Sequence, residues 1–447
     1  MTERTGGWRP RWGVAYARLR GGISRYRLPP GPLLALDREE KTDRRFLLQH
    51  FARHGPIFKA VAWDEFWVCI TGLARCGRFL QENSTRIRPV TLELKDLFPQ
   101  GFLRQMQGEV HQTYRRALVR AIRDEDPARL NGDLEATASR SLMDFHLEAR
   151  DSEDTAEALI RTLTRISSGM LVQIFFGAKP GSPRFDALLA GYQKLGPHGL
   201  VWNLGPRQEH AFRELRETLL RQLREPEAPP DGILARIDQK KPRGEATDAV
   251  DDTLLGNLIY MVEMGRYDAQ GLFRWLTKYA AEHPDLLRAI ATECASPPTA
   301  GSSLARAFVL ESLRMDQSER LVRRAERDLV FDGYLIPRFS KIRLCLWESH
   351  KSEDSFAEPF RFDPSRFLSA PPAGDRFSPF GLDHHRCPLA DVSVDMGIAF
   401  LRALARGYTV TALGDGKPLR GPYHWEPPHA FSVKLERREA SCNAARP

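Results

Sequence analysis

The sequence predicts a mainly helical protein with a smaller β-rich region built from both ends of the chain. From about Leu103 to Leu286, apolar residues recur mostly at spacings of three and four, which is typical of helices. Residues 56–71 are rich in β-branched and aromatic side chains, which favours two short strands. Strand-like segments return at 320–345 and again after a last helix at 389–406.

The helical body shows its apolar periodicity most clearly in four segments: 109–123, 155–177, 208–224 and 254–282. A further helix is expected at 303–315, directly before the strands at 320–345. Within those strands, Asp332-Gly333 is a dipeptide that favours a tight hairpin turn.

The domain organisation follows from the absence of long linkers and internal repeats in the 447 residues. We predict one domain over residues 29–435, which begins at the turn-forming segment Pro29-Pro30-Gly31-Pro32. It is flanked by a basic tail, 1–28, and a C-terminal tail, 436–447. The arginine-rich first tail could touch an anionic membrane surface, but we expect it to be a partly disordered extension.

Composition excludes several classes of protein. With 42% apolar and 28% charged residues, the chain is ordinary for a globular protein. It contains no uncharged apolar run of about 18 residues, so we expect no transmembrane anchor. The net charge of +8 is scattered and comes with no nucleic-acid-binding motif, so it favours an acidic redox partner over nucleic acid. Six cysteines without regular spacing, and no signal peptide, predict a cytoplasmic protein.

The segment that bears most on chemistry is FSPFGLDHHRCPLA, residues 377–390. Its Cys387 follows a glycine-containing loop and precedes a helix that we expect to begin near Pro388. Helix-start amides and neighbouring cations stabilise a thiolate, and a thiolate is one of the axial ligands of haem iron. An isolated cysteine is more often a small buried residue, so Cys387 needs support from other residues.

Two arginines and a glutamate supply that support. Glu311 and Arg314 stand one helical turn apart in ESLR, and Arg366 follows in FDPSRF, residues 362–367. A buried Glu–Arg–Arg cluster can lock an irregular loop because bidentate ion pairs fix geometry. Each of these residues alone would more simply be a solvated surface charge.

A zinc site is the competing interpretation of the same loop. Asp383, His384, His385 and Cys387 all carry ligand atoms for zinc. Such closely spaced ligands usually need a second cluster elsewhere, and the sequence offers none. We therefore favour haem over zinc.

In this order, the three motifs resemble the cytochrome P450 family, whose pattern is E-x-x-R, F-x-P-x-R-F and F-x-x-G-x-(R/H)-x-C-x-G. The resemblance covers roughly Pro29 to Leu435. It implies the mainly α cytochrome P450 fold, with haem b (iron protoporphyrin IX) bound to Cys387. It also implies an oxidoreductase of the monooxygenase type that acts on a small organic molecule, with ferredoxin and ferredoxin reductase as electron donors. The Arg- and Ala-rich composition favours a substrate from a biosynthetic pathway.

The resemblance also assigns residues around the haem. His111, Arg115, Arg323 and His385 match family positions that hold the haem propionates, where cations and hydrogen-bond donors suit carboxylates. Phe380 matches the aromatic residue that packs near the sulfur and tunes its electronic properties.

The cysteine loop departs from the family pattern at two positions. Asp383 stands where the family has a glycine, and Leu389 replaces the glycine after the ligand. The first glycine commonly takes a backbone conformation that is costly for other residues, although aspartate tolerates it better than most. Leu389 predicts a shifted contact between the following helix and the haem.

A larger departure lies in the long helix expected over the haem. The family segment A-G-x-(D/E)-T falls on Met264-Gly265-Arg266-Tyr267-Asp268, and only Gly265 matches. In the family, the acid and the alcohol deliver protons during dioxygen activation. Met264 is expected to fill a gap, or less simply to ligate iron through its thioether.

The missing pair leaves three readings open. Tyr267 and Asp268 form a different proton relay, or the oxidant is peroxide or a bond already present in the substrate, or the protein binds haem without turnover. We predict non-standard oxygen activation, with Asp268 or Arg266 binding a polar substrate group. Glu319 and Arg320 could lie near the ligand and favour a polar substrate, but the simpler interpretation is that they face solvent or pair with each other. The alternatives are an ordinary ferredoxin-dependent monooxygenase and a non-catalytic haem protein that supports a partner enzyme.

Overall fold

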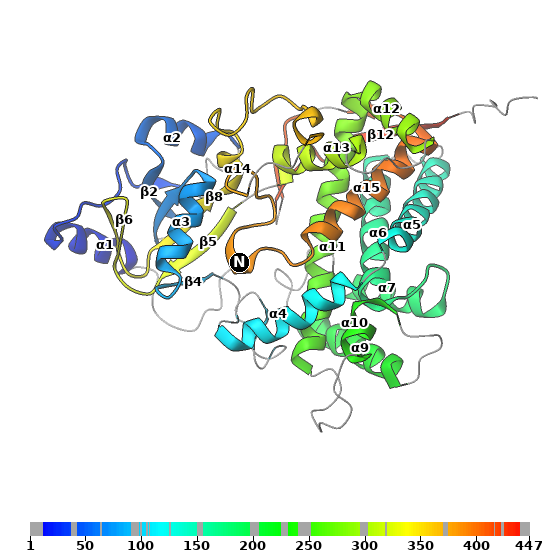
Figure 1. The fold of residues 1–447 in the computed structure, drawn as a ribbon, viewed down its shortest axis with the longest axis horizontal. Coiled ribbons are helices and arrows are strands. Elements are labelled where there is room, and N and C mark those ends of the chain that lie inside the picture. Colours follow the sequence, from blue (N-terminus) through cyan, green and yellow to red (C-terminus); the bar gives the residue numbers. More distant parts are fainter. Residues whose placement is uncertain are drawn as a thin grey trace, which may run out of the picture. The chain divides into compact units, whose positions relative to one another are not determined.

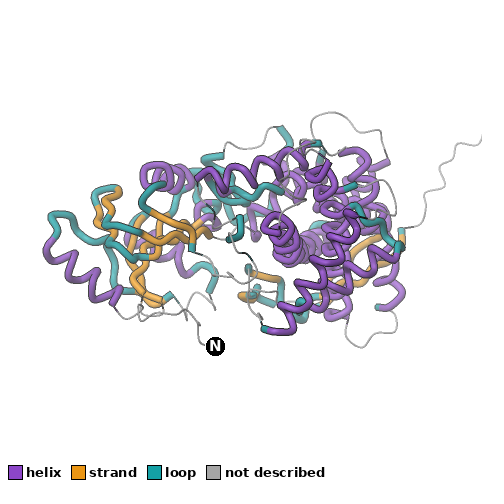
Figure 2. Tube along the Cα trace, turned by 90° about the horizontal axis from the view of Figure 1, so that it is seen from below, coloured by secondary structure: helices purple, strands orange, loops and turns teal. Residues whose placement is uncertain are grey.

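The computed structural model of the chain describes residues 12–36, 43–62, 65–90, 98, 101–103, 106, 108–124, 127–149, 155–196, 205–224, 231–239, 252–295, 303–317, 320–369, 374–414, 416–421 and 424–438. Helices make up most of this part of the chain, as the sequence predicts (Figure 2). The chain divides into two compact units. Unit 1 comprises Met1–Thr91, Leu313–Phe362 and Pro371–Cys387, and unit 2 comprises Leu92–Ser312, Asp363–Ala370 and Pro388–Pro447.

Unit 1 contains the larger sheet (Figure 1). Its helices are α1 (Trp12–Ile23), α2 (Phe46–His54), α3 (Leu73–Asn83) and α14 (Leu346–Ser349). Its strands are β1 (Leu34–Ala35), β2 (Ile57–Ala62), β3 (Glu65–Ile70), β4 (Ile87–Pro89), β5 (Arg320–Ala325), β6 (Leu329–Phe331), β7 (Tyr334–Ile336) and β8 (Lys341–Cys345).

The six-stranded sheet of unit 1 runs in the order β1-β2-β3-β8-β5-β4. The predicted strands at 56–71 are confirmed as the antiparallel pair β2–β3. Asp332 and Gly333, with φ of 45° and 78°, form the predicted turn between β6 and β7. A core that includes Phe66, Phe79 and Ile342 packs on this sheet, because strand side chains alternate between its faces.

Unit 2 contains the helical body (Figure 1). Its helices are α4 (Gly108–Arg123), α5 (Pro127–Glu148), α6 (Thr155–Phe176), α7 (Pro183–Lys194), α9 (Pro206–Arg224), α10 (Gly232–Gln239), α11 (Asp252–Glu282), α12 (Pro284–Ala295), α13 (Leu304–Ser312) and α15 (Ala390–Gly407). Its strands are β9 (Tyr408–Leu413), β10 (Leu419–Arg420), β11 (Trp425–Glu426) and β12 (Ser432–Arg437).

The long helix α11 is the central element of unit 2. It packs against α6, and also contacts α13, α15 and the β10–β11 hairpin. Residues on most sides of α11 are buried, as expected of a helix with neighbours all around it. The four segments with the clearest apolar periodicity are confirmed as α4, α6, α9 and α11.

The N-terminal tail is corrected by the structure. Residues 12–23 form α1, whose Ala17 is fully buried in the core of unit 1. The Arg20 guanidinium donates to the Asp328 carboxylate at 2.6 Å, and the Tyr16 hydroxyl donates to the same carboxylate at 3.3 Å. The segment from residue 12 onward is therefore part of the folded protein. At the other end, β12 extends to Arg437, two residues into the expected C-terminal tail.

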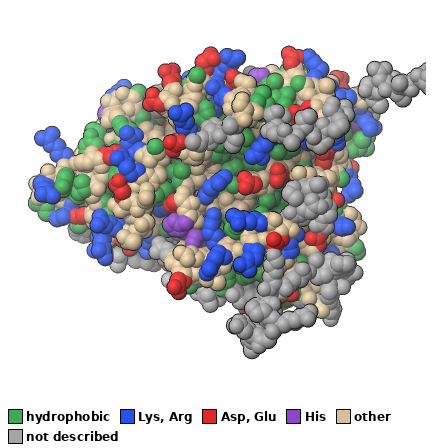
Figure 3. Space-filling model, in the orientation of Figure 1, with side chains coloured by type: hydrophobic (Ala, Val, Ile, Leu, Met, Phe, Trp, Pro, Cys, Tyr) green, Lys and Arg blue, Asp and Glu red, His purple; other side chains and the backbone are tan. Residues whose placement is uncertain are grey.

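None of the helices in the described part of the chain combines the length and apolar character needed to span a bilayer. On the face drawn in Figure 3, Lys and Arg side chains are spread among Asp and Glu side chains.

Candidate active site

Cys387 ends the irregular loop that the sequence singled out. Its backbone N–H donates to the Phe380 carbonyl at 3.0 Å, which closes the loop on itself. The Ser378 hydroxyl donates to the Gly381 carbonyl at 2.6 Å, and Gly381 has a φ of 90° that favours glycine. Phe380, the residue expected near the sulfur, is therefore tied to the cysteine through its backbone.

Asp383 has the backbone conformation that its place in the motif predicts. Its φ is 64°, in the left-handed region where the family has glycine and where aspartate is better tolerated than most residues. Its carboxylate accepts the backbone N–H of His385 at 2.7 Å and lies 3.5 Å from the Arg323 guanidinium. The substitution thus adds two polar contacts, and sequence reasoning had not anticipated that Asp383 pairs with Arg323.

Cys387 also differs from the other described cysteines. It is partly exposed, whereas Cys69, Cys76, Cys294 and Cys345 are buried. Burial raises the pKa of the Cys76 thiol to about 12, so this thiol stays protonated. Among the described cysteines, Cys387 alone is partly exposed, which fits the expected haem ligand.

The zinc interpretation gains no support, because the described residues contain no group of three or more His, Cys, Asp and Glu side chains placed to hold a metal ion.

The four residues expected to bind the propionates come from both units. In unit 2, His111 and Arg115 lie one turn apart on the same side of α4, with His111 buried and Arg115 partly exposed. In unit 1, Arg323 lies on β5 with its side chain 4% exposed, and His385 is partly exposed at the end of the cysteine loop. The His384 and His385 rings lie 4.2 Å apart.

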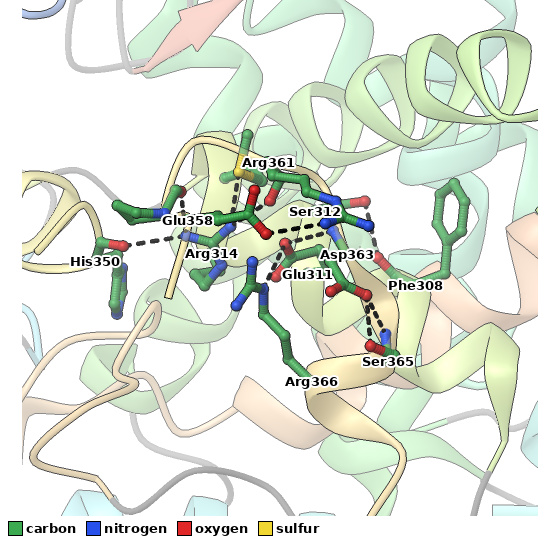
Figure 4. A network of polar contacts seen from close by, with 12 residues as sticks. Phe308, Glu311, Ser312, Arg314, His350, Glu358, Arg361, Asp363, Ser365 and Arg366 are labelled. Atoms are coloured by element: carbon green, nitrogen blue, oxygen red, sulfur yellow. Dashed lines mark hydrogen bonds and ion pairs between the residues drawn. The ribbon is translucent and has the colours of Figure 1, made fainter. Parts of the chain in front are cut away.

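Within unit 2, Glu311 and Arg366 form part of the predicted ionic cluster (Figure 4). Glu311 lies in the last turn of α13 with its side chain fully buried, and one carboxylate oxygen lies 3.6 Å from the Arg366 guanidinium. The same oxygen accepts the Asp363 backbone N–H at 2.8 Å. The Asp363 carboxylate in turn accepts the Ser365 backbone N–H, which caps the short 3-10 helix that carries Arg366.

Within unit 1, Arg314 holds an irregular segment by its backbone (Figure 4). The guanidinium is fully buried and donates to the carbonyls of His350, Pro359 and Arg361 at 3.1, 2.7 and 3.1 Å. It also lies over the Phe356 ring at 4.9 Å. A planar donor fork suits several carbonyls at once, so one side chain fixes a stretch that has no regular hydrogen bonds.

His350 links this stretch to the cysteine loop, and sequence reasoning missed it. Its Nε2 accepts the backbone N–H of Ser378 at 3.0 Å, and its ring lies 5.6 Å from that of Phe377. Burial, followed by the charges of Lys351 and Arg314, lowers the pKa of His350 well below its usual value. The ring is therefore neutral, which leaves Nε2 able to accept.

On α11, Arg266 and Tyr267 take part in a buried polar cluster. The Arg266 guanidinium lies 2.9 Å from the Glu263 carboxylate and donates to the Gly196 carbonyl at 2.8 Å. It also donates to the Tyr267 hydroxyl at 2.6 Å, while that hydroxyl donates to the same Gly196 carbonyl. Glu263 is fully buried, and a buried carboxylate without a partner would be strongly destabilising, so the cluster supplies the charge partner that this carboxylate needs.

Met264, Gly265 and Asp268 lie elsewhere on the same helix. Met264 and Gly265 are partly exposed, and a Cβ at Gly265 would lie 3.3 Å from the Leu171 side chain. The Asp268 side chain is 65% exposed, and its carboxylate lies 3.9 Å from His424 Nδ1. One of the three readings joins Tyr267 and Asp268 in a proton relay; in the structure, Tyr267 bonds to Arg266 and Gly196, and Asp268 lies near His424. Glu319 and the Arg320 side chain lie outside the described residues.

Sequence comparisons connect these motifs to known proteins. Residues 303–393, which include Glu311, Arg366 and Cys387, match the cytochrome P450 family. Abscisic acid 8'-hydroxylase 1 of Arabidopsis thaliana is 26% identical over 451 residues, which cover 94% of this chain and 93% of that protein. Ent-kaurenoic acid oxidase 1 of Hordeum vulgare is 28% identical over 206 residues, or 43% of this chain and 41% of the relative.

Solved structures agree on the fold. The retinoic acid-bound cyanobacterial CYP120A1 superposes with a TM-score of 0.70 at 17% identity, covering 93% of this chain and all of that one. A zebra fish cytochrome P450 with abiraterone gives a TM-score of 0.68 at 18% identity, with 89% of this chain covered and all of the other.

Proposed function

We propose that this chain, which belongs to the cytochrome P450 family, oxidises a small polar organic molecule at a haem b held by the Cys387 thiolate. Its relatives are named as hydroxylases and oxidases of small organic molecules, and the chain is an oxidoreductase of the same monooxygenase class. Cys387 is partly exposed, whereas the other described cysteines are buried, and this difference supports its role as the ligand. Haem supplies the redox chemistry, because a thiolate ligand favours O–O cleavage.

The haem propionates are assigned to His111, Arg115, Arg323 and His385. Replacing any one of the four by alanine should weaken haem retention by about 1–3 kcal/mol, as expected for the loss of one charge-assisted hydrogen bond. Transfer of haem from each variant to apomyoglobin measures the effect. The smallest change is expected for Arg323→Ala, because the Asp383 carboxylate already lies 3.5 Å from that guanidinium and competes with a propionate.

The matched control is Arg116→Ala, which removes an exposed arginine one position further along α4. Arg116 donates to the Gln112 carbonyl of its own helix and should leave haem transfer unchanged. Normal haem retention in all four test variants would refute the assignment.

The distal residues support a departure from the usual acid–alcohol pair. Tyr267 donates to the Gly196 carbonyl and Arg266 pairs with Glu263, so both have structural partners within unit 2. Asp268, which the resemblance aligns with the alcohol, is mostly exposed and is the distal residue that we retain for proton transfer or for binding a polar substrate group. A carboxylate there accepts protons more readily than a hydroxyl does.

The oxidant that suits a distal carboxylate is a peroxide. Activation of dioxygen requires protons to be delivered, whereas hydrogen peroxide brings its own protons and needs a base that moves one of them. We therefore propose peroxide, or an oxidised bond already present in the substrate, as the source of the oxidising equivalent. The observation that carries this proposal is the exposed carboxylate of Asp268 at the position where the resemblance places the alcohol.

The test compares two oxidant systems on one probe, thioanisole, whose sulfoxidation consumes one oxygen atom. One reaction contains hydrogen peroxide without reductant, and the other contains oxygen with NADPH, ferredoxin and ferredoxin reductase. We expect the peroxide reaction to be faster. Asp268→Thr, which restores the family alcohol, should slow the peroxide reaction and raise the oxygen-dependent one. Efficient turnover with dioxygen and reductant alone would make the protein an ordinary monooxygenase, and no turnover in either system would favour a non-catalytic role.

A further inference from the structure

His424 is a buried histidine that the family motifs do not use. It precedes β11 in the β10–β11 hairpin of unit 2, and its side chain is 5% exposed. Neither ring nitrogen has a hydrogen-bond partner among the described residues. A buried polar group without a partner typically costs about 1–3 kcal/mol, so its presence calls for a functional reason.

The helix beside His424 is shaped to accommodate the ring. Gly271 lies inside α11, and a Cβ at that position would lie only 1.8 Å from His424 Nε2. A glycine in a helix interior costs about 1 kcal/mol relative to alanine. Here it gives the imidazole room to lie against the helix backbone.

The hairpin that carries His424 is fastened to α11 by the next turn of the helix. The Arg274 guanidinium donates to the Glu426 carboxylate at 2.5 Å and to the carbonyls of Pro427 and Pro428 at 3.2 Å. The Trp275 indole N–H donates to the Trp425 carbonyl at 3.0 Å. These bonds fix the residues that follow His424, so its ring is held in place.

Asp268 lies three residues before Gly271, on the same side of α11. Its carboxylate is 3.9 Å from His424 Nδ1, which is longer than a hydrogen bond and short enough to close by a small side-chain movement. Catalytic hydrogen bonds are often long before a ligand is bound. Two further charged groups at this hairpin, Arg274 and Glu426, pair with each other, and Arg420 lies on β10.

We propose that Asp268 is the acid–base catalyst for hydrogen peroxide and that His424 positions it, an inference that rests on the function proposed above. The Asp268 carboxylate takes the proton from one peroxide oxygen and gives it to the other, which leaves as water when the O–O bond breaks. Haem held by Cys387 would supply the two-electron redox chemistry of this cleavage, and the substrate, which takes up the remaining oxygen atom, would be the net two-electron donor. Peroxide is thus reduced, the substrate is oxidised, and Asp268 ends ionised as it began.

His424 acts through Asp268. With the proton on Nδ1, its ring donates to a carboxylate oxygen and fixes the orientation of the carboxylate, as the partners of catalytic side chains commonly do. The two residues therefore have different roles: the exposed Asp268 carboxylate contacts the peroxide, and the buried His424 imidazole orients that carboxylate.

The first measurement does not depend on turnover. Histidine labelled with 15N in the diamagnetic ferrous carbonmonoxy protein reports which ring nitrogen of His424 carries the proton. We expect Nδ1 to be protonated in the wild type, and the signal to change in Asp268→Asn. A proton on Nε2 alone in the wild type would overturn the pair, even if the peroxide reaction is efficient.

The second measurement is peroxide-supported sulfoxidation of thioanisole. Asp268→Asn should lower kcat about 100-fold, the usual scale for a lost acid–base catalyst. His424→Leu should lower it about 10-fold, and His424→Asn, whose amide can donate from the place of Nδ1, should recover most of the loss. His429→Gln, an exposed histidine in the same loop, is the control and should be unchanged.

The double variant of Asp268 and His424, together with the choice of oxidant, separates this inference from the function on which it rests. In the Asp268→Asn background, His424→Leu should have no further effect, since His424 acts only through the carboxylate. A full additional 10-fold loss would overturn the positioning role. A wild type active only with dioxygen and reductant would instead refute the peroxide function, and with it the acid–base step.

Discussion

Cys387→Ala will remove the red-shifted Soret band of the ferrous carbonmonoxy complex and reduce oxidation to the background rate. The band would depend on a thiolate ligand to the haem iron, and alanine offers no ligand atom. The variant should still fold, because Cys387 is partly exposed and not buried, and because its loop is held by backbone bonds that alanine keeps, such as the one to the Phe380 carbonyl. Difference spectra and circular dichroism measure the two effects separately.

Cys294→Ala is the matched control, since it removes another described cysteine from the end of α12. Burial raises the pKa of the Cys294 thiol, so this residue is a protonated packing group, and its loss should leave the Soret band in place. An unchanged spectrum in Cys387→Ala, or a lost band in Cys294→Ala, would show that the ligand has been assigned to the wrong residue.

The sequence predicted the helices best where the apolar pattern is long. The segments that became α6 and α11 bury residues on most sides, so their apolar residues mark them clearly. The turn at Asp332-Gly333 was equally predictable, because few dipeptides tolerate two successive positive φ angles. In these places, local chemistry alone decides the structure.

The N-terminal segment was mispredicted because its partners are distant in sequence. Residues 12–23 contain arginines and glycines that resemble a solvated tail, and nothing local shows that Ala17 is buried. The helix is secured by Tyr16 and Arg20, which contact Asp328 more than 300 residues further along the chain. Long-range contacts of this kind override local propensity.

The distal helix shows the same limit at the candidate site. A helix repeat could place Met264 and Asp268 on one side, because residues four apart face the same way. It could not show that Arg266 and Tyr267 find the Gly196 carbonyl, or that His424 lies beside Asp268. The exposed or buried state of these side chains depends on loops that carry no pattern of their own.

Glu311→Ala will destabilise the folded protein by about 3–5 kcal/mol, the usual cost of breaking a buried ion pair by removing one partner. Glu311 is fully buried, and its carboxylate lies 3.6 Å from the Arg366 guanidinium. The alanine variant leaves that guanidinium without its carboxylate and the Asp363 N–H without its acceptor. We expect little folded holoprotein and a clearly lower Tm, measured by haem absorbance and thermal denaturation.

The contrast with an exposed ion pair makes this expectation specific. Glu157→Ala removes a carboxylate that is 56% exposed and lies 4.0 Å from Arg161 on α6, and such pairs contribute about 0–1 kcal/mol. Glu311→Gln should fall between the two variants, since its amide oxygen can still accept the Asp363 N–H while the charge opposite Arg366 is lost. A Glu311→Ala protein with the yield and Tm of Glu157→Ala would contradict this expectation, because the Glu311–Arg366 pair would then contribute no more than a surface contact. The bonds from Arg314 to the carbonyls of His350, Pro359 and Arg361 would then be the main contacts that hold the irregular segment 350–361.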